Sequence, residues 1–533
     1  MKMSLKFKKA SVVLLVLTLL FVAGCQAVGG LDLNKTLKNA LKVTTSESNH
    51  SLEFQLHMDK ALLEESSEED KEIYNLLSQV KIQLDNVKMQ DKTHFSLEGS
   101  LKLGTETEIG FDMQANDKLL VIDVDGAKEP FTFDVTGEKL LEISGLELEE
   151  IEGYTKATKQ NEESIAKVST ELIDIVGEYG INNLPNPKNI KVNAVNEPIN
   201  GVSTSLMHVQ ASLNGPEMWS WVKSYVDALV ADRAGLDAMV SGIIKVLAAN
   251  PDIWESIGEA DPFNSGELDA MTEDEFAKES SEALSEMLIE LQGELSKLDK
   301  SEDEMLKEAL TDELVLKTDF YVDSKLDIRK QQFELSFTPK SSEEEPAIPF
   351  GFTLKSTSES WNVNGVVKAN APVLTNNQVA VEDIVTLQGY QTLKLFDENS
   401  QIHDLLKNKF HLNKQSYQSF SDDYYNAPII MPSYITMVAV RDVADVFGAT
   451  VTYDPATKKV TVFDEATNTK IVIQSGSSIA LINGKKVEWK QPVVNFNGSM
   501  YVPARKLAEA LGAEINWEPV DEAAKVLTIE REL

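Results

Sequence analysis

Apolar and polar residues alternate along many stretches of the chain after residue 51. The alternating apolar positions begin with Leu52, Phe54, Leu56 and Met58 and recur in residues 80–84, 109–113, 122–124 and 131–135. A period of two places these side chains on one face of a strand. Turn residues such as Asn116-Asp117 and Asp125-Gly126 separate the runs. We therefore predict an antiparallel sheet with one buried face.

A spacing of three and four residues marks the middle of the chain. A first helix is predicted over residues 165–179, where it ends near two glycines. A longer one begins at Pro216, and its apolar stripe reaches Leu247, with Arg233 at a missing apolar step. Thr272 and Glu275 have the spacing of a capping box and start the next helix, whose leucine stripe runs towards residue 305. Such stripes normally pack against a helix or a sheet; the alternative is a helical pair that closes over an apolar ligand.

Strand patterns return at residues 314–319, 326–337 and 350–354, and Asn200-Gly201 and Asn364-Gly365 have the composition of hairpin turns. The order of sheet, helices and sheet predicts an α+β domain over residues 51–375. This domain resembles the lipoprotein-carrier superfamily in its strand order, in the Ile199-Asn200-Gly201-Val202 hairpin followed by two helices, and in the strand Phe320-Tyr321-Val322-Asp323. The resemblance implies a curved antiparallel sheet with long helices at its mouth. Residues 376–430 are interpreted as a connecting segment.

The C-terminal residues 431–533 contain an internal repeat at an offset of 64 residues. The segment from Val438 to Tyr453 is repeated from Val502 to Trp517, and each copy predicts a short helix that ends at a glycine, followed by a strand. Asn483-Gly484 and Asn497-Gly498 predict two hairpins between the copies. We predict a small antiparallel sheet packed on two short helices. Val451, Tyr453, Ile515 and Trp517 are expected on its inner face.

The second copy carries a family resemblance. The segments Ser478-Ile479-Ala480-Leu481-Ile482-Asn483-Gly484-Lys485 and Tyr501-Val502-Pro503-Ala504-Arg505-Lys506-Leu507-Ala508-Glu509-Ala510-Leu511-Gly512-Ala513, followed by Trp517, resemble the copper amine oxidase-like N-terminal domain. That module occurs in secreted and surface proteins of Gram-positive bacteria. The resemblance implies that copper and the tyrosine-derived quinone of amine oxidases belong to a separate catalytic domain. That domain carries a His-x-His pair and an Asn-Tyr-Asp/Glu motif.

Neither of those strings is present in this chain. Its six histidines are scattered, and none follows His411. We therefore predict no catalytic, metal or cofactor residues and no enzymatic activity. Arg441 and Arg505, at equivalent positions of the two copies, could bind an anion such as a cell-wall polymer. The alternative is that each pairs with a nearby carboxylate, which is the commoner role of such an arginine.

The N-terminus has the pattern of a secretory signal peptide. Four lysines precede an apolar run over residues 12–22, and Val22-Ala23-Gly24-Cys25 follows. These four residues resemble the bacterial lipobox, which implies cleavage after residue 24 and attachment of a lipid, with acyl chains such as palmitate, to Cys25. The alternative is an uncleaved anchor with an incidental cysteine. We predict a signal peptide over residues 1–24, a tether over residues 25–50, and a location on the extracytoplasmic face of the cell membrane.

The net charge of the chain limits the classes of partner that it can bind. It has 533 residues, with 50 Lys and Arg against 86 Asp and Glu, and removal of the four N-terminal lysines changes the net charge from −36 to −40. Phosphate backbones would be repelled, so nucleic acids are excluded as nonspecific partners. The single cysteine excludes an internal disulfide. The leading hypothesis is a lipid-anchored surface protein with a non-catalytic C-terminal interaction module; the alternative is a carrier or sensor of a hydrophobic ligand in the middle domain.

Overall fold

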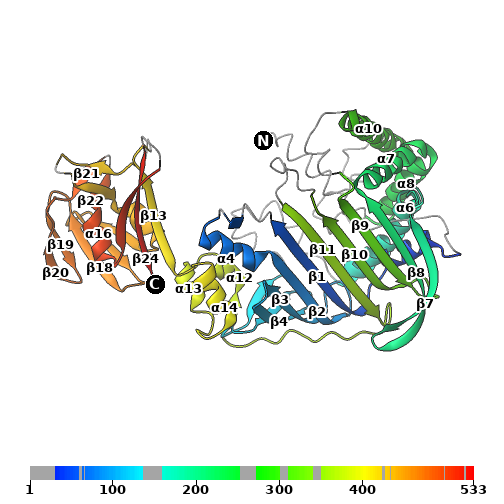
Figure 1. The fold of residues 1–533 in the computed structure, drawn as a ribbon, viewed down its shortest axis with the longest axis horizontal. Helices are drawn as coiled ribbons and strands as arrows, with labels where there is room; N and C mark the ends of the chain where they lie inside the picture. The colour runs from blue at the N-terminus through cyan, green and yellow to red at the C-terminus, as the bar shows by residue number, and fades with distance from the viewer. Residues whose placement is uncertain are drawn as a thin grey trace. The chain divides into compact units, whose positions relative to one another are not determined.

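The computed structural model describes residues 30–58, 63–64, 66–135, 159–251, 272–300, 310–339, 350–422, 427–432, 434–496, 498–520 and 524–533. The predicted signal peptide and Cys25 lie outside these residues. The chain divides into two compact units, and the second consists of Gly126–Glu129 and Asp383–Leu533. The first unit contains the remaining residues up to Glu382. Each unit is described by itself below (Figure 1).

The first unit is built on one sheet of twelve strands. Their order is β12-β6-β5-β4-β3-β2-β1-β11-β10-β9-β8-β7, and all neighbours are antiparallel except β12 and β6. The strands are β1 (Ser46–Met58), β2 (Gln79–Met89), β3 (Phe95–Leu103), β4 (Thr107–Ala115), β5 (Leu119–Val124), β6 (Phe131–Asp134), β7 (Ile190–Ile199), β8 (Val202–Asn214), β9 (Leu314–Val322), β10 (Ile328–Phe337), β11 (Phe350–Trp361) and β12 (Val379–Ala380). The large antiparallel sheet predicted from the period of two is confirmed.

Apart from α4 (Glu68–Leu77), which lies beside β2, the helices of the first unit gather at the β7–β9 end of this sheet (Figure 1). These are α2 (Leu33–Leu41), α6 (Lys159–Gly180), α7 (Gly215–Ala231), α8 (Arg233–Ala248) and α10 (Glu273–Lys300). Trp221 and Val226 of α7 and Leu295 of α10 pack against Leu316 and Leu335 of the sheet. Each such buried side chain stabilises the fold by about 1.5–3 kcal/mol. The mixed α+β class is therefore confirmed.

The long helix predicted from Pro216 is two helices. The backbone N–H of Asp232 ends α7 by donating to Ala228 O at 3.0 Å, and the Asp232 side chain accepts from Gly235 N at 2.9 Å and begins α8. Arg233 therefore does not complete an apolar stripe; its guanidinium pairs with Asp237 at 2.9 Å on the exposed side. The capping box at the start of α10 is confirmed, because Thr272 and Glu275 exchange hydrogen bonds.

The predicted tether over residues 25–50 differs from the structure from residue 31 onward. Asp32 caps α2 by accepting from Lys35 N at 2.9 Å, and Leu33 and Leu37 are buried. Strand β1 already begins at Ser46. The apolar positions of residues 31–41 were too few to predict a helix from the sequence. Long-range contacts with α6, such as the ion pair of Lys42 with Asp174, hold α2 in place.

The predicted hairpin at Asn364-Gly365 is wrong. A turn closes between Gly365 N and Asn362 O at 3.0 Å, but no strand returns along β11 in the residues that follow it. The turn is tied instead to the residues before β1, since Thr44 N donates to Asn364 Oδ1 and Thr45 Oγ1 donates to Gly365 O. The hairpin predicted at Asn200-Gly201 is confirmed: Ile199 pairs with Val202, and both turn residues have positive φ.

The predicted connecting segment, residues 376–430, belongs to both units. Strand β12 pairs with β6, whereas Asp383 begins the C-terminal part of the second unit. Short helical elements follow: α12 (Val381–Ile384), α13 (Gly389–Leu393), α14 (Gln401–Asp404) and the π-helical turn η3 (Leu405–Lys409). Among the described residues, no helix is long and apolar enough to cross a membrane.

The second unit has three small sheets around one core rather than the single sheet we predicted. Their orders are β13-β24-β23, β14-β15-β22-β21 and β16-β17-β18-β19-β20. The elements are β13 (Lys414–Phe420), β14 (Ile429–Ile430), β15 (Thr436–Ala439), α15 (Val440–Val446), β16 (Thr450–Asp454), β17 (Lys459–Asp464), β18 (Thr469–Gln474), β19 (Ile479–Ile482), β20 (Lys485–Glu488), β21 (Val494–Phe496), β22 (Ser499–Pro503), α16 (Ala504–Ala510), β23 (Glu514–Pro519) and β24 (Lys525–Glu532). The two short helices were predicted correctly.

Candidate interaction module

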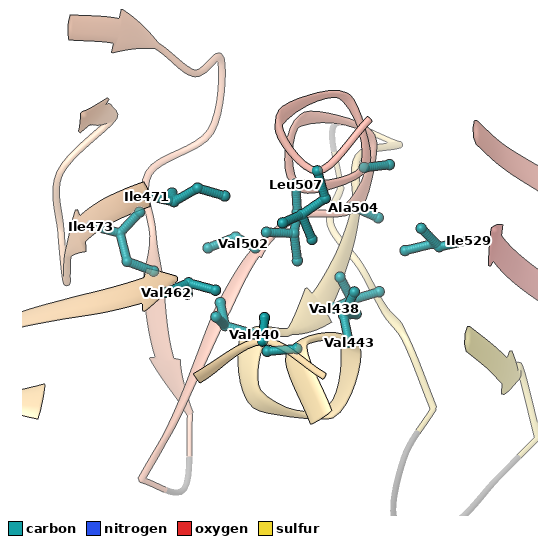
Figure 2. Packing of buried hydrophobic residues seen from close by; sticks show 14 of the residues in the cluster. Val438, Val440, Val443, Val462, Ile471, Ile473, Val502, Ala504, Leu507 and Ile529 are labelled. Carbon is teal, nitrogen blue, oxygen red and sulfur yellow. The ribbon is translucent and has the colours of Figure 1, made fainter. Parts of the chain in front are cut away.

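The two sequence repeats meet at a local twofold axis. Strands β15 and β22 are antiparallel, and Val438 lies directly opposite Val502, its equivalent in the second copy. On either side, Met437 faces Pro503 and Ala439 faces Tyr501, so the pairing has the same symmetry as the repeat. Figure 2 shows both valines between side chains of the two helices. Because each copy presents its apolar face to the other, neither can bury its core alone.

Both repeat helices end in the same backbone motif. Gly448 and Gly512 have φ of 64° and 69°, a left-handed conformation that glycine adopts at low cost. Ala449 N donates to Ala444 O at 2.8 Å, and Ala513 N donates to Ala508 O at 2.9 Å. These bonds form Schellman caps, which satisfy carbonyls at the helix ends. The sequence prediction of a glycine stop in each copy is confirmed.

The core between the helices is apolar and closely packed (Figure 2). Its side chains are at most a few per cent exposed, and they come from both helices and from all three sheets: Val440, Val443, Val462, Ile471, Ile473, Val502, Ala504, Leu507 and Ile529. Val451, Ile515 and Trp517 pack against this core as predicted. Tyr453 does not, since it is 55 % exposed at the edge of its sheet.

One arginine is buried where the two repeats converge. Arg531, in β24, donates through Nη1 to Leu511 O at 2.8 Å and through Nη2 to Phe447 O at 3.5 Å. These carbonyls are the equivalent C-cap groups of α16 and α15. Helix C-termini carry partial negative charge, so they favour a cation there. The guanidinium also lies over the Phe447 ring, 4.4 Å from its centroid.

The carboxylate of Asp464, at the end of β17, neutralises this arginine. Nη1 lies 2.5 Å from Oδ2 and Nη2 lies 3.0 Å from Oδ1, and the two side chains are 1 % and 0 % exposed. Gln415 accepts from Arg531 Nε at 2.8 Å. Burial raises the pKa of Asp464, but hydrogen bonds from Arg531 and Thr467 outweigh burial and hold the pKa below its ordinary value. The charges are thus paired and hydrogen-bonded, which a buried ion pair requires.

Arg441 and Arg505 occupy equivalent, exposed positions near the starts of α15 and α16. Neither forms a direct ion pair with a described carboxylate, although the charge of Arg441 partly offsets the rise that burial causes in the pKa of the neighbouring Asp442. Sequence reasoning missed Arg531, because it lies outside both copies of the repeat. The only sequence signal for a role of Arg531 was weak: an arginine occupies a buried-face position in a strand whose apolar and polar residues otherwise alternate.

A second candidate region is the apolar face of β1–β5 in the first unit. Leu103 and Ile109 on this face are 7 % and 6 % exposed, but most of its apolar side chains are only half-buried: Phe54, Ile82, Leu84, Leu101, Phe111, Met113 and Ile122. Leu52 on the same face is 42 % exposed. By contrast, Leu316 and Leu335, which lie under α7 and α10, are 3 % and 6 % exposed. The sheet therefore has a helix-covered apolar part and a more open one.

No group of three His, Cys, Asp or Glu side chains within the described ranges could hold a metal ion. Residues 416–526 match the family model of the copper amine oxidase N-terminal domain. The match starts before residue 431, our predicted boundary, in agreement with the pairing of β13 with β24. Neither the curated proteins nor the solved structures contain a match to the chain.

Proposed function

We propose that this chain is a lipid-anchored protein on the extracytoplasmic face of the cell membrane, with a non-catalytic C-terminal module that contacts the cell wall. The observation that carries the proposal is the match of residues 416–526 to the copper amine oxidase N-terminal domain on a chain that also contains Val22-Ala23-Gly24-Cys25. A lipid on Cys25 would hold the acidic chain at the membrane, since each buried CH₂ contributes about 0.8 kcal/mol.

Metabolic labelling with a fatty acid tests the anchor. The chain has one cysteine, so a thioether-linked lipid has one possible site. We expect the unchanged chain to be labelled and to sediment with membranes, and Cys25→Ser to lose both properties. Gln26→Ser, at the neighbouring position, is the matched control and should keep them. Labelling that persists in Cys25→Ser would refute the lipid anchor.

The more open apolar face of β1–β5 favours a second candidate function, a carrier or sensor of a hydrophobic ligand. Leu101 lies on this face and Ser100 on the opposite, polar face. Native mass spectrometry of the Cys25→Ser chain, purified from lipid-containing cells, should detect a bound lipid mass. Leu101→Lys should abolish that mass and Ser100→Lys should not. A mass equal to that of the chain alone would refute this function.

A further inference from the structure

The five-stranded sheet β16–β20 has an unusual charge for this chain. Residues 450–490, which contain the five strands, have six lysines and four acidic residues, whereas the whole chain has 50 basic against 86 acidic residues. One of the four acids, Asp464, is buried in its ion pair with Arg531. The exposed surface of this segment therefore carries a positive excess on a strongly negative protein.

The lysines gather on and beside the outer face of the sheet. The inner face is fixed by Val462, Ile471 and Ala480, which are at most 1 % exposed in the core. Alternation then places Lys470 and Lys486 on the outer face, where Lys470 pairs with Phe463 and Lys486 with Leu481. Lys470 and Lys486 lie two strands apart and are offset by two residues along the strands. Strand spacing and rise per residue therefore place their Cα atoms about 12 Å apart.

Three further lysines lie near this surface and are exposed. Lys458 lies in the turn before β17, and Lys490 follows β20. Lys485 follows the Asn483-Gly484 turn, where its pairing with Ile482 places it on the opposite face from Lys486. None of these three, nor Lys470 or Lys486, forms an ion pair with a described carboxylate. Three exposed acids oppose these lysines. Glu488 lies on the same face, Asp454 lies opposite Lys459 in the register, and Glu465 lies in the turn between β17 and β18.

Apolar groups accompany the lysines. Phe463, beside Lys470, is 39 % exposed, and Ile479 is 49 % exposed. A face that combines spaced ammonium groups with an exposed ring suits a flexible polymer that alternates anionic groups with carbon-rich units. An extended polymer can follow this narrow strip. The net negative charge of the whole chain disfavours a flat anionic membrane as the ligand.

We propose that the outer face of β16–β20, centred on Lys470 and Lys486, binds the phosphate-bearing anionic polymer of the cell wall. The proposal rests on the proposed function, because it names the partner and the surface through which the C-terminal module contacts the wall. Arg441 and Arg505 are not needed for it.

The test is co-sedimentation of the full-length Cys25→Ser chain with purified Gram-positive cell walls, before and after acid hydrolysis removes their phosphate polymers. We expect binding to untreated walls that weakens in high salt. Lys470→Glu with Lys486→Glu should weaken it about tenfold. Lys92→Glu with Lys118→Glu, which changes two exposed lysines of the first unit, is the charge-matched control and should bind like the unchanged chain.

The outcomes separate the two proposals. If no variant sediments with untreated walls, the wall-binding function itself is refuted. If the unchanged chain binds equally well to stripped walls, or if the Lys470 and Lys486 variant binds as tightly as the control, the wall contact remains but this surface and its polymer ligand are wrong.

Discussion

Arg531 and Asp464 form a bidentate ion pair that is closed off from water, with side chains 1 % and 0 % exposed. The pair joins the last strand of the chain to β17, and the same guanidinium bonds the C-cap carbonyls of both repeat helices. A single side chain thus links the two copies of the repeat and two of the three sheets.

We expect Arg531→Met to destabilise the second unit by about 3–5 kcal/mol, because it leaves the Asp464 carboxylate buried without a counter-ion. Hydrogen exchange of β17 and β24 measures this change within the full chain. Arg505→Met removes an exposed arginine of the same unit and is the matched control, with an expected effect within about 0.5 kcal/mol.

The double variant Arg531→Met with Asp464→Leu tests the same pair from the other side. With both charges removed, no buried charge remains, so the double variant should be more stable than Arg531→Met alone. Additive losses would show that the two side chains are not energetically coupled.

Stability of the second unit should fall in acid. The pKa of Asp464 is lower in the folded protein than in the unfolded chain, because bonds from Arg531 and Thr467 outweigh the effect of burial. The ionised form therefore stabilises the fold above the unfolded pKa, near 4, and this contribution is lost as pH falls through the folded value. Denaturation followed between pH 7 and pH 3 should show the loss, and Asp464→Asn should flatten the dependence. An equally steep dependence in that variant would contradict this assignment.

The two C-cap glycines should differ in their tolerance of alanine. A Cβ on Gly512 meets no atom within 4 Å, so Gly512→Ala costs only the left-handed strain, about 1 kcal/mol. A Cβ on Gly448 would lie 2.7 Å from Gln388 Cγ, which adds a clash of about 1 kcal/mol or more. Thermal unfolding of the two variants measures the difference; equal losses would contradict the close approach of Gln388.

Asp112→Asn should stabilise the first unit at neutral pH. Burial, and then the carboxylates of Glu98, Asp123 and Asp125, raise the pKa of Asp112 in the folded protein. A raised carboxyl pKa means that stability decreases as pH rises through the range between the unfolded and folded values. The gain from Asp112→Asn should therefore vanish near pH 3. Glu106→Gln, an exposed acid in a turn, is the control and should show no such gain.

Patterns that depend on neighbouring residues were predictable from the sequence. The period of two gave the strands around Leu52, and the repeat gave both helix–strand units with their glycine stops. Features that depend on distant partners were not. The pairing of Arg531 with Asp464 joins residues 67 apart, and α2 is held to α6 by Lys38 and Lys42, more than 130 residues from their partners.

The site residues predicted from the sequence located the interaction surface only in part, because that surface also depends on residues that are distant in the chain. Arg441 and Arg505 stood out because they repeat, but their exposure and lack of a direct ion pair with a described carboxylate could not be read from spacing. The outer-face lysines of β16–β20 became apparent only when the register separated the inner from the outer face of that sheet.

The claim that the second unit contacts the cell wall is tested most directly by locating the residues that become protected when the wall binds. Hydrogen–deuterium exchange of the full-length Cys25→Ser chain, with and without soluble cell-wall fragments, measures this residue by residue. We expect added protection within residues 414–533, strongest in β18 to β20, and unchanged exchange in the twelve-stranded sheet. Protection confined to that twelve-stranded sheet, or no added protection anywhere, would contradict that claim.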